Sequence, residues 1–191
     1  MLYVTPSVSR CNYIAVVGGG LSPRYPPHKV AIWDDLKKKI VIELEFCSEV
    51  RAVRLRRDRI VVVLETVIKV FTFTSSPTQL HLFDTAANSS GLCSLSPSCD
   101  NSVLAMPGTK LGQLQLVDLQ SADSPPLLIS AHDSPLSIVQ LNVQVLSCYC
   151  IGQLAPQYSP LIGPEDEYCG QVSCDWLTSI LPSDWCRMCR P

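Results

Sequence analysis

The sequence predicts an all-β fold, and three observations support that prediction. Between Arg10 and Asn142, short β-branched or alternating segments are separated by turn residues. Helical periodicity is nearly absent from the same stretch. A weak repeat also returns at offsets of about 38 and 46 residues, which indicates that similar sheets follow one another along the chain.

Composition limits the classes of protein that this chain can belong to. Its 191 residues, 47% of them hydrophobic, suit one domain with a packed core. A formal net charge of −2 gives no overall attraction to nucleic acid or anionic membranes. No apolar run approaches the roughly 20 residues that span a bilayer, and Pro6, Ser9 and Arg10 interrupt any secretory signal. We therefore expect a cytoplasmic protein whose ten cysteines are reduced thiols.

Ten strands are expected in chain order, each bounded by turn residues. Arg56, Arg57 and Asp58 form a polar turn between two of them, and this hairpin turn is expected to project into solvent. The strand that follows is continuously apolar from Ile60 to Leu64, as expected for a strand covered on both faces. The ten strands are Asn12–Val17, Lys29–Asp34, Ile40–Phe46, Val50–Leu55, Arg59–Leu64, Val67–Phe73, Gln79–Phe83, Ser102–Ala105, Gln113–Asp118 and Leu136–Leu141.

The repeat identifies the kind of sheet. Val30–Asp34 is echoed by Ile68–Thr72 and by Leu114–Asp118, at offsets close to the roughly 40 to 45 residue period of WD-type blades. Each echo ends in an apolar residue plus Asp or Thr, followed by a turn and an outer strand. Trp33 is expected to pack between blades, and Asp34 to form the turn. The fold class is therefore a partial WD40-type β-propeller.

A long set of ordered strings resembles one family of such propellers. Val17–Gly20, Ile32–Lys39 and Leu55–Leu64 are similar to strings of the PROPPINs, the WD-repeat phosphoinositide-interacting β-propellers. The resemblance implies about three of seven blades: the end of one blade, the next one or two, and the opening of another. Further matching strings are Ile68–Thr74, Gly91–Cys93, Pro107–Thr109, Gln115–Leu119 and Ala131–His132.

The resemblance divides the chain into three regions. We expect residues 1–9 to form a divergent N-terminal segment, residues 10–142 the partial propeller, and residues 143–191 a divergent, disordered, largely irregular tail rich in Cys and Pro. The tail contains Cys186-x-x-Cys189 with Cys169 and Cys174 upstream. Only one of these pairs has zinc-knuckle spacing, so no metal and no cofactor are expected.

The family's lipid chemistry depends on a Phe/Leu-Arg-Arg-Gly motif between later blades, whose arginines hold phosphoinositide head groups. The nearest string here is Leu55–Asp58, in an early blade, where a carboxylate stands in place of the glycine and competes with phosphate. We expect the lipid site to be missing from this chain. The basic cluster around the hairpin is a solvated edge or, alternatively, a weak anion site made by Arg54, Arg56, Arg57 and Arg59.

Catalysis is not expected. His132 and Asp133 stand near Ser130 and Ser134, but nothing in the sequence brings a nucleophile and a base together, and His132 is expected to hold a turn by hydrogen bonds. Gly18–Gly20 lacks the following helix that a dinucleotide-binding loop requires.

The resemblance therefore implies a non-enzymatic, autophagy-linked scaffold. Relatives in this branch dock an autophagy lipid-transfer protein through early blades, which assigns Arg51, Arg54 and Lys69 to protein binding. The alternative is an effector that binds phosphatidylinositol 3-phosphate or 3,5-bisphosphate at autophagic membranes. Family members reach autophagic precursor membranes and endolysosomes, and no nucleic-acid partner is expected.

Overall fold

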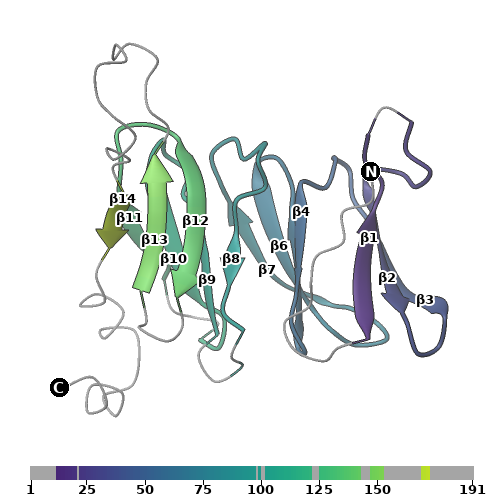
Figure 1. Cartoon of the computed structure of the whole chain (residues 1–191). Coiled ribbons are helices and arrows are strands. Elements are labelled where there is room, and N and C mark those ends of the chain that lie inside the picture. The colour runs from purple at the N-terminus through teal and green to yellow at the C-terminus, as the bar shows by residue number, and fades with distance from the viewer. Residues whose placement is uncertain are drawn as a thin grey trace. The chain divides into compact units, whose positions relative to one another are not determined.

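The computed structural model describes residues 12–20, 22–97, 99, 102–121, 125–142, 147–152 and 169–172. In this part of the chain the regular elements are the fourteen antiparallel strands β1 to β14, which confirms the predicted all-β class (Figure 1). The described residues contain no helix long and apolar enough to cross a bilayer. The chain divides into two units, Met1–Leu92 and Cys93–Pro191.

The first unit consists of two meandering sheets. One has the order β1-β2-β3 and the other the order β4-β5-β6-β7, so that each strand pairs with its neighbour in sequence. Seven expected strands are present here with ends shifted by two residues at most, because turn chemistry marks these ends locally. The strands are β1 (Tyr13–Val17), β2 (Lys29–Asp34), β3 (Lys39–Glu45), β4 (Ala52–Leu55), β5 (Arg59–Val63), β6 (Val67–Thr72) and β7 (Gln79–Asp84).

The core of the first unit lies between these two sheets. Ile32 from β2 and Ile60 and Val62 from β5 are fully buried in one hydrophobic cluster. Phe46 and Phe71 meet edge to face there, with ring centroids 6.0 Å apart. All four residues from Ile60 to Val63 have no exposed surface, which confirms that β5 is covered on both faces.

The second unit also contains two sheets, ordered β11-β10-β9-β8 and β12-β13-β14. Sequence reasoning missed β8, which has only two residues, and β11, which follows Pro125 and Pro126. Neither segment offers enough alternation for a local signal. The strands are β8 (Ser94–Leu95), β9 (Val103–Pro107), β10 (Gln113–Asp118), β11 (Leu127–Ser130), β12 (Leu136–Asn142), β13 (Ser147–Gly152) and β14 (Cys169–Val172).

The last sheet continues past the point where the sequence repeat was expected to end. Strand β12 pairs with β13, and β13 pairs with β14, so two strands belong to the region expected to be irregular. The domain boundary at Asn142 stays a prediction. The segment 1–9, the rest of the tail and the side chains of Cys169, Cys174, Cys186 and Cys189 lie outside the described residues.

The three echoes of the sequence repeat occupy equivalent strands, β2, β6 and β10, and end in equivalent hydrogen bonds. Asp34 Oδ1 accepts the backbone N–H groups of Leu36 and Lys37 at 3.0 and 3.1 Å. Thr72 Oγ1 accepts the N–H of Thr78, and Asp118 Oδ1 that of Gln120, both at 2.9 Å. A short polar side chain at this position thus satisfies a backbone donor in the following turn, which explains why Asp and Thr interchange there.

Candidate functional site

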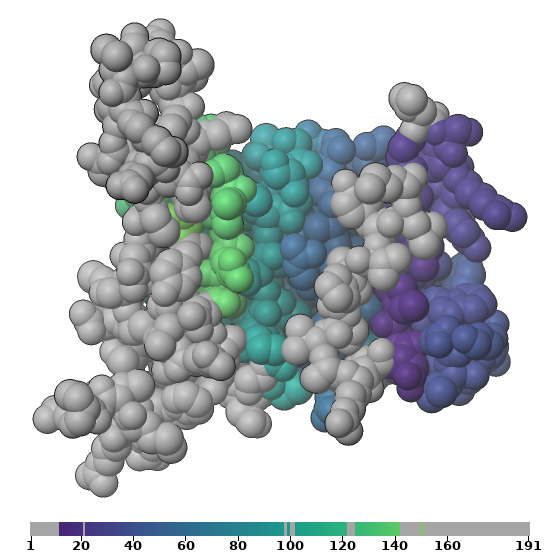
Figure 2. Space-filling model, in the orientation of Figure 1, coloured from purple at the N-terminus to yellow at the C-terminus, as the bar shows by residue number. Residues whose placement is uncertain are grey.

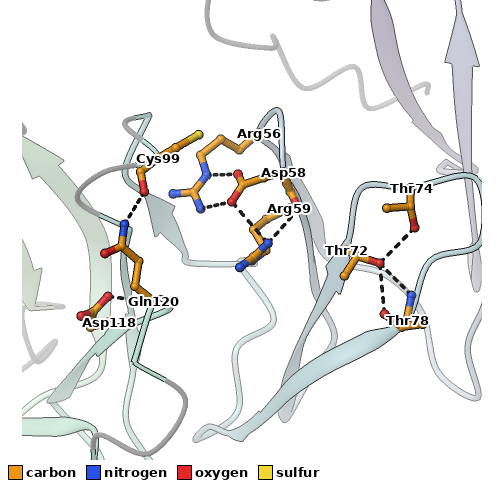
Figure 3. Close-up of polar contacts among 9 residues, drawn as sticks. All are labelled: Arg56, Asp58, Arg59, Thr72, Thr74, Thr78, Cys99, Asp118 and Gln120. Atoms are coloured by element: carbon orange, nitrogen blue, oxygen red, sulfur yellow. Dashed lines mark hydrogen bonds and ion pairs between the residues drawn. The ribbon is translucent and has the colours of Figure 1, made fainter.

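The arginine-rich hairpin between β4 and β5 is built around a buried ion pair. Arg56, whose side chain is only 4% exposed, binds Asp58 through two hydrogen bonds, Nε to Oδ1 at 2.6 Å and Nη2 to Oδ2 at 2.9 Å (Figure 3). The backbone N–H of Arg56 also donates to the carbonyl of Arg59 at 2.9 Å. The expected projection of this turn into solvent is wrong for Arg56 because the side chain folds back onto Asp58; Arg57 is exposed.

Asp58 compensates more than one arginine. Its Oδ2 also lies 3.3 Å from Nη1 of Arg59. Burial alone raises the pKa of Asp58, but the hydrogen bond from Arg56 and the charges of Arg56 and Arg59 outweigh it and hold the pKa below its ordinary value. The carboxylate is therefore ionised at neutral pH and occupies the guanidinium donors that a phosphate group requires.

Replacing Asp58 with asparagine is expected to lower the free energy of unfolding by about 2 kcal/mol at neutral pH. A fully buried pair loses about 3 to 5 kcal/mol, and the partial exposure of Asp58 reduces this. Because the folded-state pKa lies below the ordinary 3.8, the contribution is complete above that value and is lost as the pH falls through the folded-state pKa. Urea unfolding at neutral and acid pH measures the difference in free energy of unfolding between the unchanged chain and Asp58→Asn. This difference must become smaller in acid. Arg57→Gln is the control and should change little.

The three residues assigned to protein binding do not form one surface. Arg54 pairs in register with Val61, whereas Lys69 pairs with Val62, so Arg54 and Lys69 lie on opposite faces of the sheet. Lys69 Nζ lies 5.7 Å from the centroid of the Phe46 ring, on the face that packs against the first sheet. Lys69 therefore supports the core of the unit.

Arg51 and Arg54 do share a groove. One cavity of about 150 Å³ is lined by Arg51, Arg54 and Gly91, and a second of about 510 Å³ is lined by Arg51, Glu49 and the Gly18–Gly20 connection. Both cavities include Val50, Arg51 and Ser90. We call these two adjoining cavities together the Arg51 groove. Sequence patterns do not reveal this groove, because its walls come from segments more than 60 residues apart.

Carboxylates compensate the central cation of the Arg51 groove. Arg51 Nη2 lies 2.5 Å from Glu65 Oε2, and Nη1 lies 3.4 Å from Glu49 Oε2. The hydrogen bond to Glu65 raises the pKa of Arg51. A groove that carries both positive and negative side chains suits an extended peptide better than a polyanion, because a phosphate group would be repelled by the carboxylates.

The residues expected to have structural roles are held by local hydrogen bonds. His132 Nε2 lies 3.3 Å from the carbonyl oxygen of Cys150 on β13, and its backbone N–H donates to the carbonyl of Gly112 at 3.1 Å. Asp34 is buried at its turn, and the half-buried Trp33 donates from Nε1 to Asp35 Oδ1 at 3.4 Å. These contacts suit structural roles.

Metal-ligating and thiol groups are dispersed in the described part of the chain. No three His, Cys, Asp or Glu side chains among the described residues lie in positions to hold a metal ion. Four cysteines whose side chains are described, Cys47, Cys93, Cys99 and Cys150, take part in no disulfide bond.

Comparison with known proteins places this fold and its repeat in one family. The family model PROPPIN matches residues 12–149. The chain is 44% identical over 135 residues to SVP1-like protein 2 of Emericella nidulans, a match that covers 71% of this chain and 41% of that protein. It is 39% identical over 133 residues to Autophagy-related protein 18e of Arabidopsis thaliana, covering 69% and 35%.

Solved structures agree with this result. The crystal structure of Hsv2 from Kluyveromyces marxianus aligns with a TM-score of 0.61 at 30% identity, covering 75% of this chain and 42% of that one. The chain thus spans less than half the length of these relatives. The family match reaches into β13, beyond the expected boundary at Asn142. Since it includes most of the chain, this protein belongs to the PROPPIN family of β-propellers.

Proposed function

We propose that this chain is a non-enzymatic, autophagy-linked scaffold of the PROPPIN type that works without the family's Arg-Arg-Gly lipid site. Its family and its similarity to an autophagy-related protein support the biological setting. The one Arg-Arg pair in the sequence, Arg56-Arg57, is followed by Asp58. The chain is assigned to the cytoplasm, where autophagy proteins recruit it to precursor membranes.

The partner is an autophagy protein, such as a lipid-transfer protein, whose extended segment lies in the Arg51 groove. The mixed charges of Arg51 and Glu49 supply a donor and an acceptor for a peptide, and the Gly18–Gly20 connection lines the same cavity. Arg54 lines the same groove. Lys69 stays outside this assignment because it contacts Phe46 on the opposite face of its sheet.

One observation favours a scaffold over a lipid effector. Arg56 is buried against Asp58, and Arg59 is paired with the same carboxylate. Two of the four arginines of the alternative lipid site thus already have an anionic partner within the chain. A phosphoinositide head group must displace Asp58 to reach them, and this displacement costs the free energy of the ion pair.

Vesicle flotation separates the two functions. The purified chain is mixed with phosphatidylcholine vesicles with and without phosphatidylinositol 3-phosphate, beside full-length SVP1-like protein 2 as the positive control. We expect no flotation of the chain above the phosphatidylcholine background. Strong flotation specific to the phosphoinositide would overturn the scaffold and establish the lipid effector as the function, and Arg57→Ala and Arg54→Ala would then identify the residues that bind the lipid.

A further inference from the structure

The first unit contains a second cavity, distinct from the Arg51 groove, and we propose that it binds a small phosphorylated anion. The cavity has a volume of about 540 Å³ and is lined by Lys37, Lys39 and Arg57 together with hydroxyl and aromatic side chains. Its volume lies within the roughly 300 to 1,000 Å³ typical of small-molecule sites. We call it the Lys39 pocket.

Four separate segments build the Lys39 pocket, and one of them is β1, which contributes Tyr13. Lys37 comes from the turn after β2 and Lys39 from the first position of β3, and the space-filling view shows the β3 segment at the surface of the first unit (Figure 2). Arg57 comes from the β4–β5 turn, and Ser75 follows β6. The backbone N–H of Phe73 donates to the carbonyl of Asp58 at 3.1 Å. This hydrogen bond holds the segment after β6 against the turn of Arg56, Arg57 and Asp58, which we call the arginine turn.

An aromatic pair belongs to the wall of the Lys39 pocket. The rings of Tyr13 and Phe73 meet edge to face, with centroids 5.1 Å apart, and Ile40 and Ile42 add aliphatic surface. Such a wall accepts the ring or chain of a ligand while cations hold its charged group. The pocket therefore combines apolar surface with a few polar groups.

The charges of the Lys39 pocket are not balanced by its own walls. Its lining includes three cations and no carboxylate. Lys37 Nζ lies 3.5 Å from the buried Asp34, so its charge is partly compensated. Within the described residues, no ion pair involves the side chains of Lys39 or Arg57. Two cations thus remain available to an incoming anion.

A phosphoryl group fits this arrangement better than a single carboxylate. Arg57 offers a planar fork for two phosphate oxygens, Lys39 a point charge, and Ser75 a hydroxyl donor. A phosphate dianion matches the two available cations, whereas one carboxylate leaves a cation uncompensated. The ligand class is therefore a phosphate monoester or diphosphate, whether free in solution or at the head of a lipid.

Titration calorimetry of the whole chain with inorganic pyrophosphate at low ionic strength tests the Lys39 pocket. The double variant Lys39→Gln, Arg57→Gln is expected to bind at least about tenfold more weakly than the unchanged chain. Lys38→Gln is the matched control, because it removes the same charge from the same turn at a residue that pairs with Asp35 and does not line the pocket. Its affinity should stay within about twofold.

Calorimetry and vesicle flotation together show whether the anion is free or part of a lipid, and they test the pocket separately from the scaffold function. If the chain binds pyrophosphate in solution but does not float with phosphoinositide vesicles, the ligand of the pocket is a free anion. Flotation with phosphatidylinositol 3-phosphate that is lost in the double variant assigns a lipid head group, which supports the pocket while overturning the scaffold function. Absence of pyrophosphate binding, equal weakening in Lys38→Gln, or an acidic peptide binding where pyrophosphate does not would each overturn the Lys39 pocket.

Discussion

Replacing Gly112 with alanine is expected to lower the free energy of unfolding of the second unit by about 3 kcal/mol or more. Gly112 has a φ of 66°, a conformation that alanine rarely adopts. A Cβ atom there would lie 1.8 Å from the carbonyl oxygen of His132. This oxygen belongs to the backbone, so it cannot move aside by a change of rotamer as a side-chain atom can. The Gly112 carbonyl also accepts the N–H groups of Ala131 and His132 at 3.1 Å each. Strain at this position therefore disturbs the segment that follows β11.

Urea unfolding followed by circular dichroism measures this effect, and Gly108→Ala is its control. A Cβ atom at Gly108 meets the side chain of Gln113, its nearest atom at 2.5 Å, and a side chain can move. Gly108 also has no positive φ. Gly108→Ala should lower the free energy of unfolding by about 1 kcal/mol, which is about the contribution of one hydrogen bond. Equal unfolding midpoints for Gly112→Ala and the unchanged chain would refute the backbone clash.

Replacing Ile60 with alanine is expected to cost the first unit about 3 to 4 kcal/mol. Ile60 has no exposed surface and lies in the cluster between the two sheets, beside Val62 and Leu55. Removing its side chain loses the transfer free energy of three carbon atoms and leaves a cavity that the neighbouring strands fill only in part. Ile60→Val should cost about 1 kcal/mol by the same reasoning.

The same urea experiment tests Ile60, with Leu36→Ala as the exposed control. Leu36 is 76% exposed in the turn after β2, so its truncation should change the free energy of unfolding by less than about 0.5 kcal/mol. The urea concentration at the unfolding midpoint must be highest for Leu36→Ala, lower for Ile60→Val and lowest for Ile60→Ala. An Ile60→Ala midpoint equal to that of Leu36→Ala would mean that this cluster does not stabilise the unit.

The arginine turn shows where prediction from sequence reached its limit. Arg56 and Arg57 are adjacent, identical in type and equally polar, so the sequence alone assigned both to a solvated turn or weak anion site. In the structure Arg56 is buried against Asp58 while Arg57 is exposed and lines the Lys39 pocket. Two adjacent residues of the same type carry no pattern that separates them, and only the folded chain shows that Arg56 is the one that pairs with Asp58. The Arg51 groove and the Lys39 pocket were missed for the same reason.

Strand positions, by contrast, follow from chemistry within a few residues of each strand. Alternating aliphatic residues mark Lys29–Asp34 and Gln113–Asp118 as strands, and Asp34 and Asp118 satisfy backbone donors in the turns that follow. The sequence by itself therefore determined these strands, their repeat and the all-β class. Only the tertiary structure decided which cations stay available to a ligand. The shape of the Lys39 pocket depends on segments brought together from distant parts of the chain, as Phe73 and Arg57 are in its wall, and no local pattern encodes that meeting.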